Sequence, residues 1–216
     1  MATKVIRPYT FGEEVCNCLT HSVGAALGVA MVAILTAFSA LYGDAWGIVS
    51  SAIFGASVIF MYSASSIYHA IQSEKIKKRL KKLDHIAIYY LIAGSYTPFL
   101  LVSIRGALGW TMFGIIWGLA VLGTILKLTL SGSGTKVWSI GLYLGMGWLV
   151  VFASKYLFAA LNTTSIIFLV SGGIAYTLGI LFYIWKSKAY THAIWHCFVL
   201  AGTILQFFSI LWIFVP

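Results

Sequence analysis

Residues 191–208 read THAIWHCFVLAGTILQFF and open the last apolar run of the chain. The run is long enough to cross the hydrocarbon core of a bilayer as one helix, which needs about 20 residues. It nevertheless begins with His192 and His196, which are one helical turn apart. Polar side chains are costly inside a membrane, so the pair raises the question of what it binds.

The composition of the whole chain agrees with a protein that is embedded in lipid. Of its 216 residues, 61% are hydrophobic and only 9% are charged. Soluble domains carry roughly 45–50% apolar and about 25% charged residues. The alternating segments of about ten residues that are typical of membrane β-barrels do not occur in the sequence. The composition therefore predicts an all-α integral membrane protein.

Seven apolar runs with short connections predict one transmembrane domain, a seven-helix bundle over residues 1–216. Short connections make neighbouring helices antiparallel, and Pro98 is expected to kink the third helix. The expected helices lie near residues 19–42, 47–72, 84–103, 107–128, 137–160, 164–185 and 191–215.

The net charge of +9 does not indicate nucleic-acid binding, because the charges lie in the connections between apolar runs. Cytoplasmic connections of membrane proteins carry an excess of Lys and Arg. A cytoplasmic N-terminus places twelve of the fourteen basic residues inside and leaves Arg105 and Lys155 for the other face. The N-terminus is therefore expected inside and the C-terminus outside. The basic run KIKKRLKK (75–82) is expected to contact anionic lipid head groups.

Nine polar residues interrupt or flank the apolar runs, and each is a candidate functional residue because such groups are costly in lipid. On the predicted topology, the first, third and seventh helices start on the cytoplasmic side and the second helix ends there. All nine residues therefore fall in one layer near the cytoplasmic interface. They are Glu14, Asn17, His21, Ser65, His69, Asp84, His85, His192 and His196.

This layer has the composition of a catalytic zinc site. His192 and His196 share one helix face, and His69 from a second helix completes a set of three histidines. Three protein ligands and a water form the arrangement of catalytic zinc. We expect Asp84 to hold or deprotonate that water as a general base, and Ser65 to hydrogen-bond the water or the substrate. The residues expected to line the same cavity or to orient the ligands are Glu14, Asn17 and His21.

Other interpretations of these histidines stay open. A histidine pair in a membrane helix can also bond across helices or lie at the interface with its polar tip in water. For His21, a role in the site and a role in helix packing are equally favoured by the sequence. His85 is left out of the site because adjacent helical residues do not share a face with each other. Iron and manganese are alternatives to zinc, although three histidines with an aspartate through water favour zinc.

Four stretches of the sequence together resemble one family. EEVCNCLTH (13–21) fits E-x-x-N-x-x-T-H, and SSIYH (65–69) fits S-x-x-x-H. KKLDHIAIYYLIAGSYTPFLL (81–101) contains the aspartate and a G-S/T-Y-T-P block, and HAIWH (192–196) fits H-x-x-x-H. The ordered set spans essentially the whole chain. It resembles the bacterial hemolysin III proteins, the prokaryotic branch of the progestin and adipoQ receptor (PAQR) family.

The resemblance implies a multi-pass protein of the bacterial plasma membrane with zinc near the cytoplasmic face. Its ligands would be His69, His192 and His196, with Asp84 contacting zinc through water. The wider superfamily includes alkaline ceramidases, which implies hydrolysis of a lipid amide and a role in membrane lipid homeostasis. Two alternatives are a pore-forming cytolysin, after the hemolysin name, and a non-catalytic sensor of membrane state with a structural zinc. The oligomeric state is left open.

Overall fold

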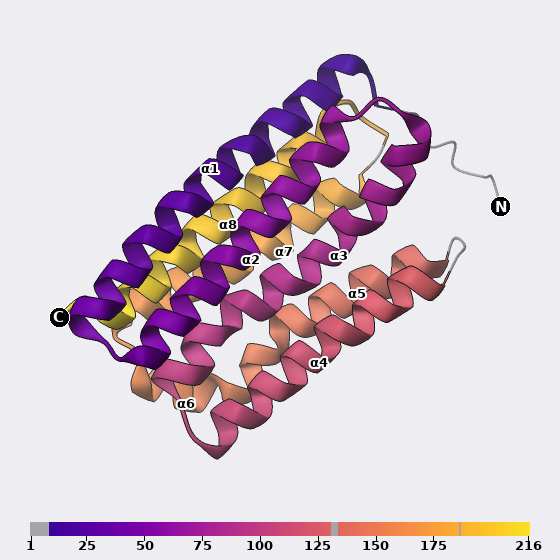
Figure 1. Ribbon diagram of the computed structural model, residues 1–216. Coiled ribbons are helices and arrows are strands. Elements are labelled where there is room, and N and C mark those ends of the chain that lie inside the picture. The colour runs from indigo at the N-terminus through magenta and orange to yellow at the C-terminus, as the bar shows by residue number, and fades with distance from the viewer. Residues whose placement is uncertain (1–8, 131–133, 186) are drawn as a thin grey trace.

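The computed structural model describes residues 9–130, 134–185 and 187–216, without the side chains of residues 134–136. This part of the chain contains no β-strand, and seven of its helical segments are long and apolar enough to cross a membrane (Figure 1). The prediction of an all-α, seven-helix membrane protein is confirmed. The elements are α1 (Phe11–Tyr42), α2 (Ala45–Ala70), α3 (Glu74–Pro98), η1 (Phe99–Ser103), α4 (Ala107–Thr129), α5 (Gly134–Trp148), η2 (Leu149–Ala153), α6 (Ser154–Ala160), α7 (Thr163–Ile184) and α8 (Thr191–Phe214).

Helices α1 and α3 begin earlier than predicted, at Phe11 rather than residue 19 and at Glu74 rather than residue 84. The apolar runs mark the part of each helix that lies in lipid, whereas the additional turns are polar. The α1 start is fixed by a capping box. The Thr10 hydroxyl accepts the backbone N–H of Glu13, and the Glu13 carboxylate accepts the Thr10 N–H. These additional polar turns help to build the site described below.

The third and fifth membrane-crossing segments are interrupted. Helix α3 ends at Pro98 and continues as the π-helical turn η1, as expected near a residue without an N–H. The fifth segment consists of α5, the 3₁₀ turn η2 and α6 rather than the one helix predicted over 137–160. The Tyr96 hydroxyl from α3 donates to the Gly147 carbonyl at 2.7 Å and accepts the Val150 N–H at 2.8 Å. Backbone groups at this break therefore find partners inside the bundle.

Tyr96→Phe is expected to destabilise the protein by about 1–2 kcal/mol, because two backbone groups lose a partner in apolar surroundings. The measurement is the thermal unfolding of the detergent-purified protein by circular dichroism. Tyr90→Phe is the control, since Tyr90 lies on the same helix and packs by its ring against Trp117. Equal melting temperatures for Tyr96→Phe and the wild type would show that the hydroxyl does not support the break.

Helices α2, α3 and α8 form the inside of the bundle. Their membrane-crossing windows are 56%, 67% and 44% buried, whereas the other four segments are between 17% and 28% buried. Helix α1 packs closely on α2, because a Cβ atom at Gly24 would overlap the Tyr62 ring. Figure 1 shows that α1, α3 and α8 begin at the end of the bundle where α2 ends. The predicted polar layer is thus one end of the bundle.

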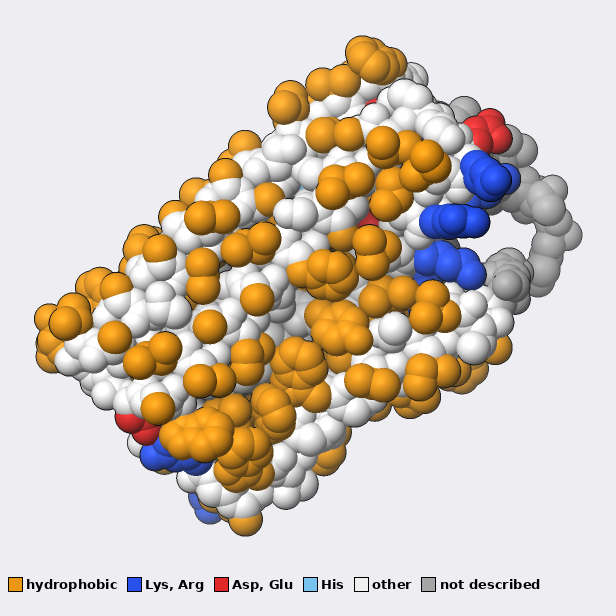
Figure 2. Space-filling view, in the orientation of Figure 1, with side chains coloured by type: hydrophobic (Ala, Val, Ile, Leu, Met, Phe, Trp, Pro, Cys, Tyr) orange, Lys and Arg blue, Asp and Glu red, His pale blue; other side chains and the backbone are white. Residues whose placement is uncertain are grey.

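Lys and Arg side chains gather at this same end of the bundle (Figure 2). The opposite end carries an ion pair in which Arg105 Nη1 lies 2.8 Å from Asp44 Oδ2. The orientation of the termini stays a prediction that rests on the positive-inside rule. Lys4, Arg7 and Lys186, which belong to the predicted cytoplasmic set, lie outside the described residues.

Candidate metal centre

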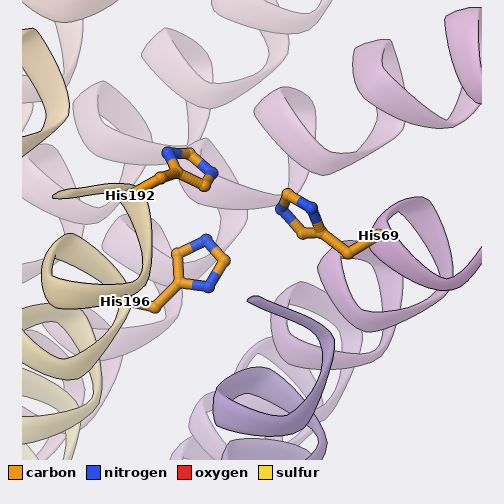
Figure 3. Close-up of side chains that lie close together, drawn as sticks. All are labelled: His69, His192 and His196. Atoms are coloured by element: carbon orange, nitrogen blue, oxygen red, sulfur yellow. The ribbon is translucent and has the colours of Figure 1, made fainter. Parts of the chain in front are cut away.

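Three histidines that are distant in the sequence meet at the end of the bundle. His69 lies in the last turn of α2, and His192 and His196 lie in the first two turns of α8. One potential ligand atom from each residue lies within 4.8 Å of the others. The ring centroids are 5.3 Å apart for His69 and His192, 5.2 Å for His69 and His196, and 4.5 Å for the α8 pair. Figure 3 shows the His69 ring facing the two rings from α8.

The hydrogen bonds of two of these rings fix which nitrogen is available to a metal. Nδ1 of His69 lies 2.6 Å from Oε2 of Glu14. Nδ1 of His196 lies 3.2 Å from the Asn17 carbonyl oxygen and 3.2 Å from Oγ1 of Thr20. Thr20 donates its own proton to backbone carbonyls, so its oxygen accepts from the ring. Both Nδ1 atoms are therefore N–H donors, which leaves the lone pair on Nε2.

The Nε2 atoms of His69 and His196 are buried and have no hydrogen-bond partner among the described residues. Both residues are nearly inaccessible to solvent, at 1% and 0% exposure. A buried nitrogen without a partner costs about 1–3 kcal/mol, so each such atom needs an explanation. A metal ion held by the three histidines supplies one, because it takes the lone pairs that the tautomers leave free. The residues present therefore fit a metal ion.

Glu14 connects the histidines to the basic start of α3. One carboxylate oxygen accepts from His69, and the other lies 2.8 Å from Nζ of Lys77. The Lys77 ammonium also donates to the carbonyl of Ile71 at 3.2 Å. The sequence predicts Glu14 near the ligands, whereas it indicates for Lys77 only a place in the basic run at the lipid surface. Lys77 lies in the first turn of α3, which begins before its apolar run, so hydropathy does not indicate that it reaches the site.

Glu14→Gln is expected to weaken zinc binding by about 10–100-fold, the usual effect of removing an acceptor from a ligating histidine. The loss of the carboxylate charge makes the His69 ring a weaker base and leaves Lys77 without its ion pair. Competition of the purified protein with a chromophoric chelator measures the zinc dissociation constant. Glu74→Gln is the control, since it removes an exposed carboxylate from the first turn of α3. An unchanged dissociation constant in Glu14→Gln would contradict this role.

Tyr9 covers the histidine cluster, a contact that no pattern in the sequence indicates. Its ring stacks on His192 with centroids 5.1 Å apart and lies 6.2 Å from the ring of His69. Burial raises the pKa of the Tyr9 hydroxyl, and the nearby Tyr68 and Tyr183 raise it further. The uncharged Tyr9 ring therefore covers the rings of His192 and His69.

The other predicted site residues are all buried near this end of the bundle. Ser65 and Asn17 are both 0% exposed, and their side-chain polar atoms have no partner among the described residues. Asp84 is 5% exposed, and its Oδ2 lies 3.6 Å from Nδ1 of His85. The His85 ring lies 2.6 Å from the carbonyl of Lys81 through the same nitrogen, so it is bound to its own helix.

His21 stacks directly on the predicted ligand His196, with ring centroids 3.5 Å apart and planes inclined by 19°. It also lines a cavity of about 270 Å³ together with Asp84. The remaining walls of this cavity come mainly from apolar side chains of α3, η1, α5, α7 and α8, among them Leu91, Phe99 and Val199. Cavities of this size and apolar character accommodate small organic or acyl groups. None of the three histidines of the candidate metal centre lines this cavity, so His21, which stacks on His196, is the residue that connects the two.

Comparison with known proteins finds a matching family and several similar proteins. Residues 9–207 match the protein family described as "Haemolysin-III related". The chain is 44% identical over 203 residues to "Hemolysin-3 homolog" of Bacillus subtilis (strain 168), covering 94% of this chain and 95% of that protein. It is 40% identical over 217 residues to "Hemolysin-3" of Bacillus cereus, covering 100% and 99%. It is also 30% identical over 210 residues to the human "Monocyte to macrophage differentiation factor", covering 92% and 83%.

Proposed function

The chain belongs to the haemolysin-III-related family, and from that premise we propose that this multi-pass membrane protein is a zinc-dependent hydrolase of lipid amides or esters. One observation carries the proposal. His69 and His196 each have a buried nitrogen without a partner among the described residues, and His21, which stacks on His196, lines an apolar cavity together with Asp84. A bilayer protein with this combination can bring the carbonyl group of a lipid next to a metal ion.

His69, His192 and His196 would hold the metal, and imidazole nitrogens suit zinc. A bound zinc polarises a carbonyl oxygen and lowers the pKa of a coordinated water to about 7. The chain's own residues prepare this chemistry. Glu14 fixes the tautomer of His69, and the Asn17 carbonyl fixes that of His196.

Asp84 would accept the proton of the attacking water and return a proton to the leaving group. It is buried at the cavity wall, where a carboxylate can act as general base next to a bound substrate. Ser65 lies one turn before His69, and its buried hydroxyl has no partner among the described residues. We assign it a hydrogen bond to the substrate or the water.

The proposed substrate is a membrane lipid whose acyl chain occupies the apolar cavity and whose head group reaches the cytoplasmic side. Its hydrolysis would serve membrane lipid homeostasis. The basic residues of 75–82, most of which are exposed, would hold anionic lipid head groups at this end of the bundle. Nothing in this distribution of charge calls for a nucleic acid as partner.

The test uses purified protein in phosphatidylcholine vesicles that contain N-acyl amides and esters with matched acyl chains. We expect mass spectrometry to detect hydrolysis products of at least one lipid class. The reaction should stop when a chelator removes the metal and resume when zinc is returned. The absence of products from every amide and ester would contradict the proposed reaction.

A second candidate function is a pore-forming cytolysin, because two similar Bacillus proteins carry the name hemolysin-3. A pore needs a polar path through the whole bilayer, whereas the candidate site residues lie at one end of the bundle, near the starts of α1, α3 and α8 and the end of α2. Leakage of a dye from the same vesicles would support the cytolysin. Bound zinc without leakage or hydrolysis would support a sensor with a structural metal.

A further inference from the structure

The histidine triad does not account for all the unpartnered polar atoms at this end of the bundle. Both ring nitrogens of His21 are buried and have no hydrogen-bond partner among the described residues, and the residue is only 1% exposed. In its neutral form an imidazole offers one N–H donor and one lone pair. Leaving both unsatisfied in an apolar interior is costly, so His21 needs a partner that is not another part of the chain.

Packing holds the His21 ring in place from two sides. One face stacks on His196, and the ring meets Tyr62 of α2 in a T-shaped contact at 4.9 Å. Thr20, its neighbour in α1, bonds to the backbone and to His196. His21 is therefore a rigid polar group beside the metal centre, and it lies at the wall of the apolar cavity.

Other polar side chains of the cavity wall are already engaged. The Tyr96 hydroxyl bonds to the η2 break, the Tyr143 hydroxyl donates to the His85 carbonyl at 2.7 Å, and the Tyr176 hydroxyl lies 2.8 Å from Oγ1 of Thr203. The Gln206 amide donates to the Leu169 carbonyl at 3.2 Å. His21 differs from these residues in that both of its polar atoms remain available to a ligand.

We infer that His21 is the polar anchor of the cavity and hydrogen-bonds the carbonyl, amide or hydroxyl group of a bound uncharged lipid. The inference rests on the proposed function in taking a lipid as the occupant of the cavity. The lipid chain then lies along the apolar wall, and its polar group meets the edge of the His21 ring, next to the proposed metal ligand His196. His21 is thus a binding residue that aligns the scissile group, and it is not a fourth ligand of the metal.

The test compares two probes with the same chain, N-dodecylacetamide and dodecyl acetate, which differ by an N–H in place of an oxygen. Their binding to the zinc-loaded protein in nanodiscs is measured by native mass spectrometry, with zinc content and product formation recorded in the same samples. His21→Phe keeps a ring for stacking on His196 but removes both polar atoms. Each probe partitions into the nanodisc lipid to the same extent in both samples. The difference in its binding between the variant and the wild type therefore reports binding to the protein.

We expect His21→Phe to bind the amide about tenfold more weakly than the wild type, with its zinc content unchanged. His21→Gln, which retains a donor and an acceptor, should recover part of this loss. The control Tyr176→Phe removes an engaged hydroxyl from the same cavity and should change amide binding by less than about twofold. An equal loss for the ester would show that His21 uses its N–H, and a loss for the amide alone would show that it uses its lone pair.

Equal amide binding in His21→Phe and the wild type would overturn the inference, as would loss of zinc from His21→Phe. The outcome is separate from that of the proposed function. Binding that depends on His21 without any product would leave the anchor intact and reject the hydrolase. Hydrolysis together with binding that does not depend on His21 would support the hydrolase and overturn the role of His21 as anchor.

Discussion

His196→Ala is expected to lose most of its bound metal and to unfold at a lower temperature than the wild type. The His196 ring is fully buried and is held through Nδ1 by the Asn17 carbonyl and the Thr20 hydroxyl. Its removal deletes one of three ligands and takes away the ring N–H that the Asn17 carbonyl and the Thr20 hydroxyl accept. Metal binding at a free concentration a thousandfold above the dissociation constant stabilises a folded protein by about 4 kcal/mol. The variant should lose nearly all of this increment.

The measurement is the melting temperature with and without added zinc. His85→Ala is the matched control, because it removes a histidine from the same end of the bundle that bonds to its own helix. The control should keep the zinc-dependent increase in melting temperature. If zinc raised the melting temperature of His196→Ala as much as that of the wild type, His196 would not be a ligand.

Asp84→Asn is expected to lower the rate constant of lipid hydrolysis by about 10²–10⁴-fold while zinc stays bound. Removal of a general acid–base group typically has an effect of this size. Asparagine has nearly the same shape but cannot take up the proton, so the buried side chain keeps its place beside the cavity. The rate is followed as product released from the reactive lipid identified with the wild type.

Asp44→Asn serves as the control for Asp84→Asn, since Asp44 lies at the opposite end of the bundle in an exposed pair with Arg105. Its hydrolysis rate should equal that of the wild type. Loss of zinc from Asp84→Asn would show that Asp84 supports the metal site instead of moving a proton. A normal rate with zinc bound would remove Asp84 from the reaction.

The three-histidine cluster could be predicted because two simple periodicities combine. Helical spacing places His192 and His196 on one face, and the alternation of helix direction places His69 at the same end of the bundle. Both the shared helix face and the shared end of the bundle can be predicted without knowing which helices are in contact. The structure adds that α2 and α8 are both inner helices, which brings the rings into contact.

The contacts around the cluster could not be predicted in the same way. Lys77 reaches Glu14 because α3 begins ten residues before its apolar run, and polar turns outside the lipid leave no hydropathy signal. Tyr9 precedes the first helix, so no periodicity relates it to His192. The break in the fifth membrane-crossing segment depends on the Tyr96 hydroxyl of another helix. Such pairings follow from tertiary packing, which local sequence patterns do not encode.

The most direct test is elemental analysis of the detergent-purified wild-type protein beside His69→Ala. We expect about one zinc per wild-type chain, bound by His69, His192 and His196, and little or none in the variant. His69 is the informative position, because it contributes the ligand from α2 and receives the bond from Glu14. A wild-type protein without metal, or a variant with the same zinc content, would contradict the metal centre.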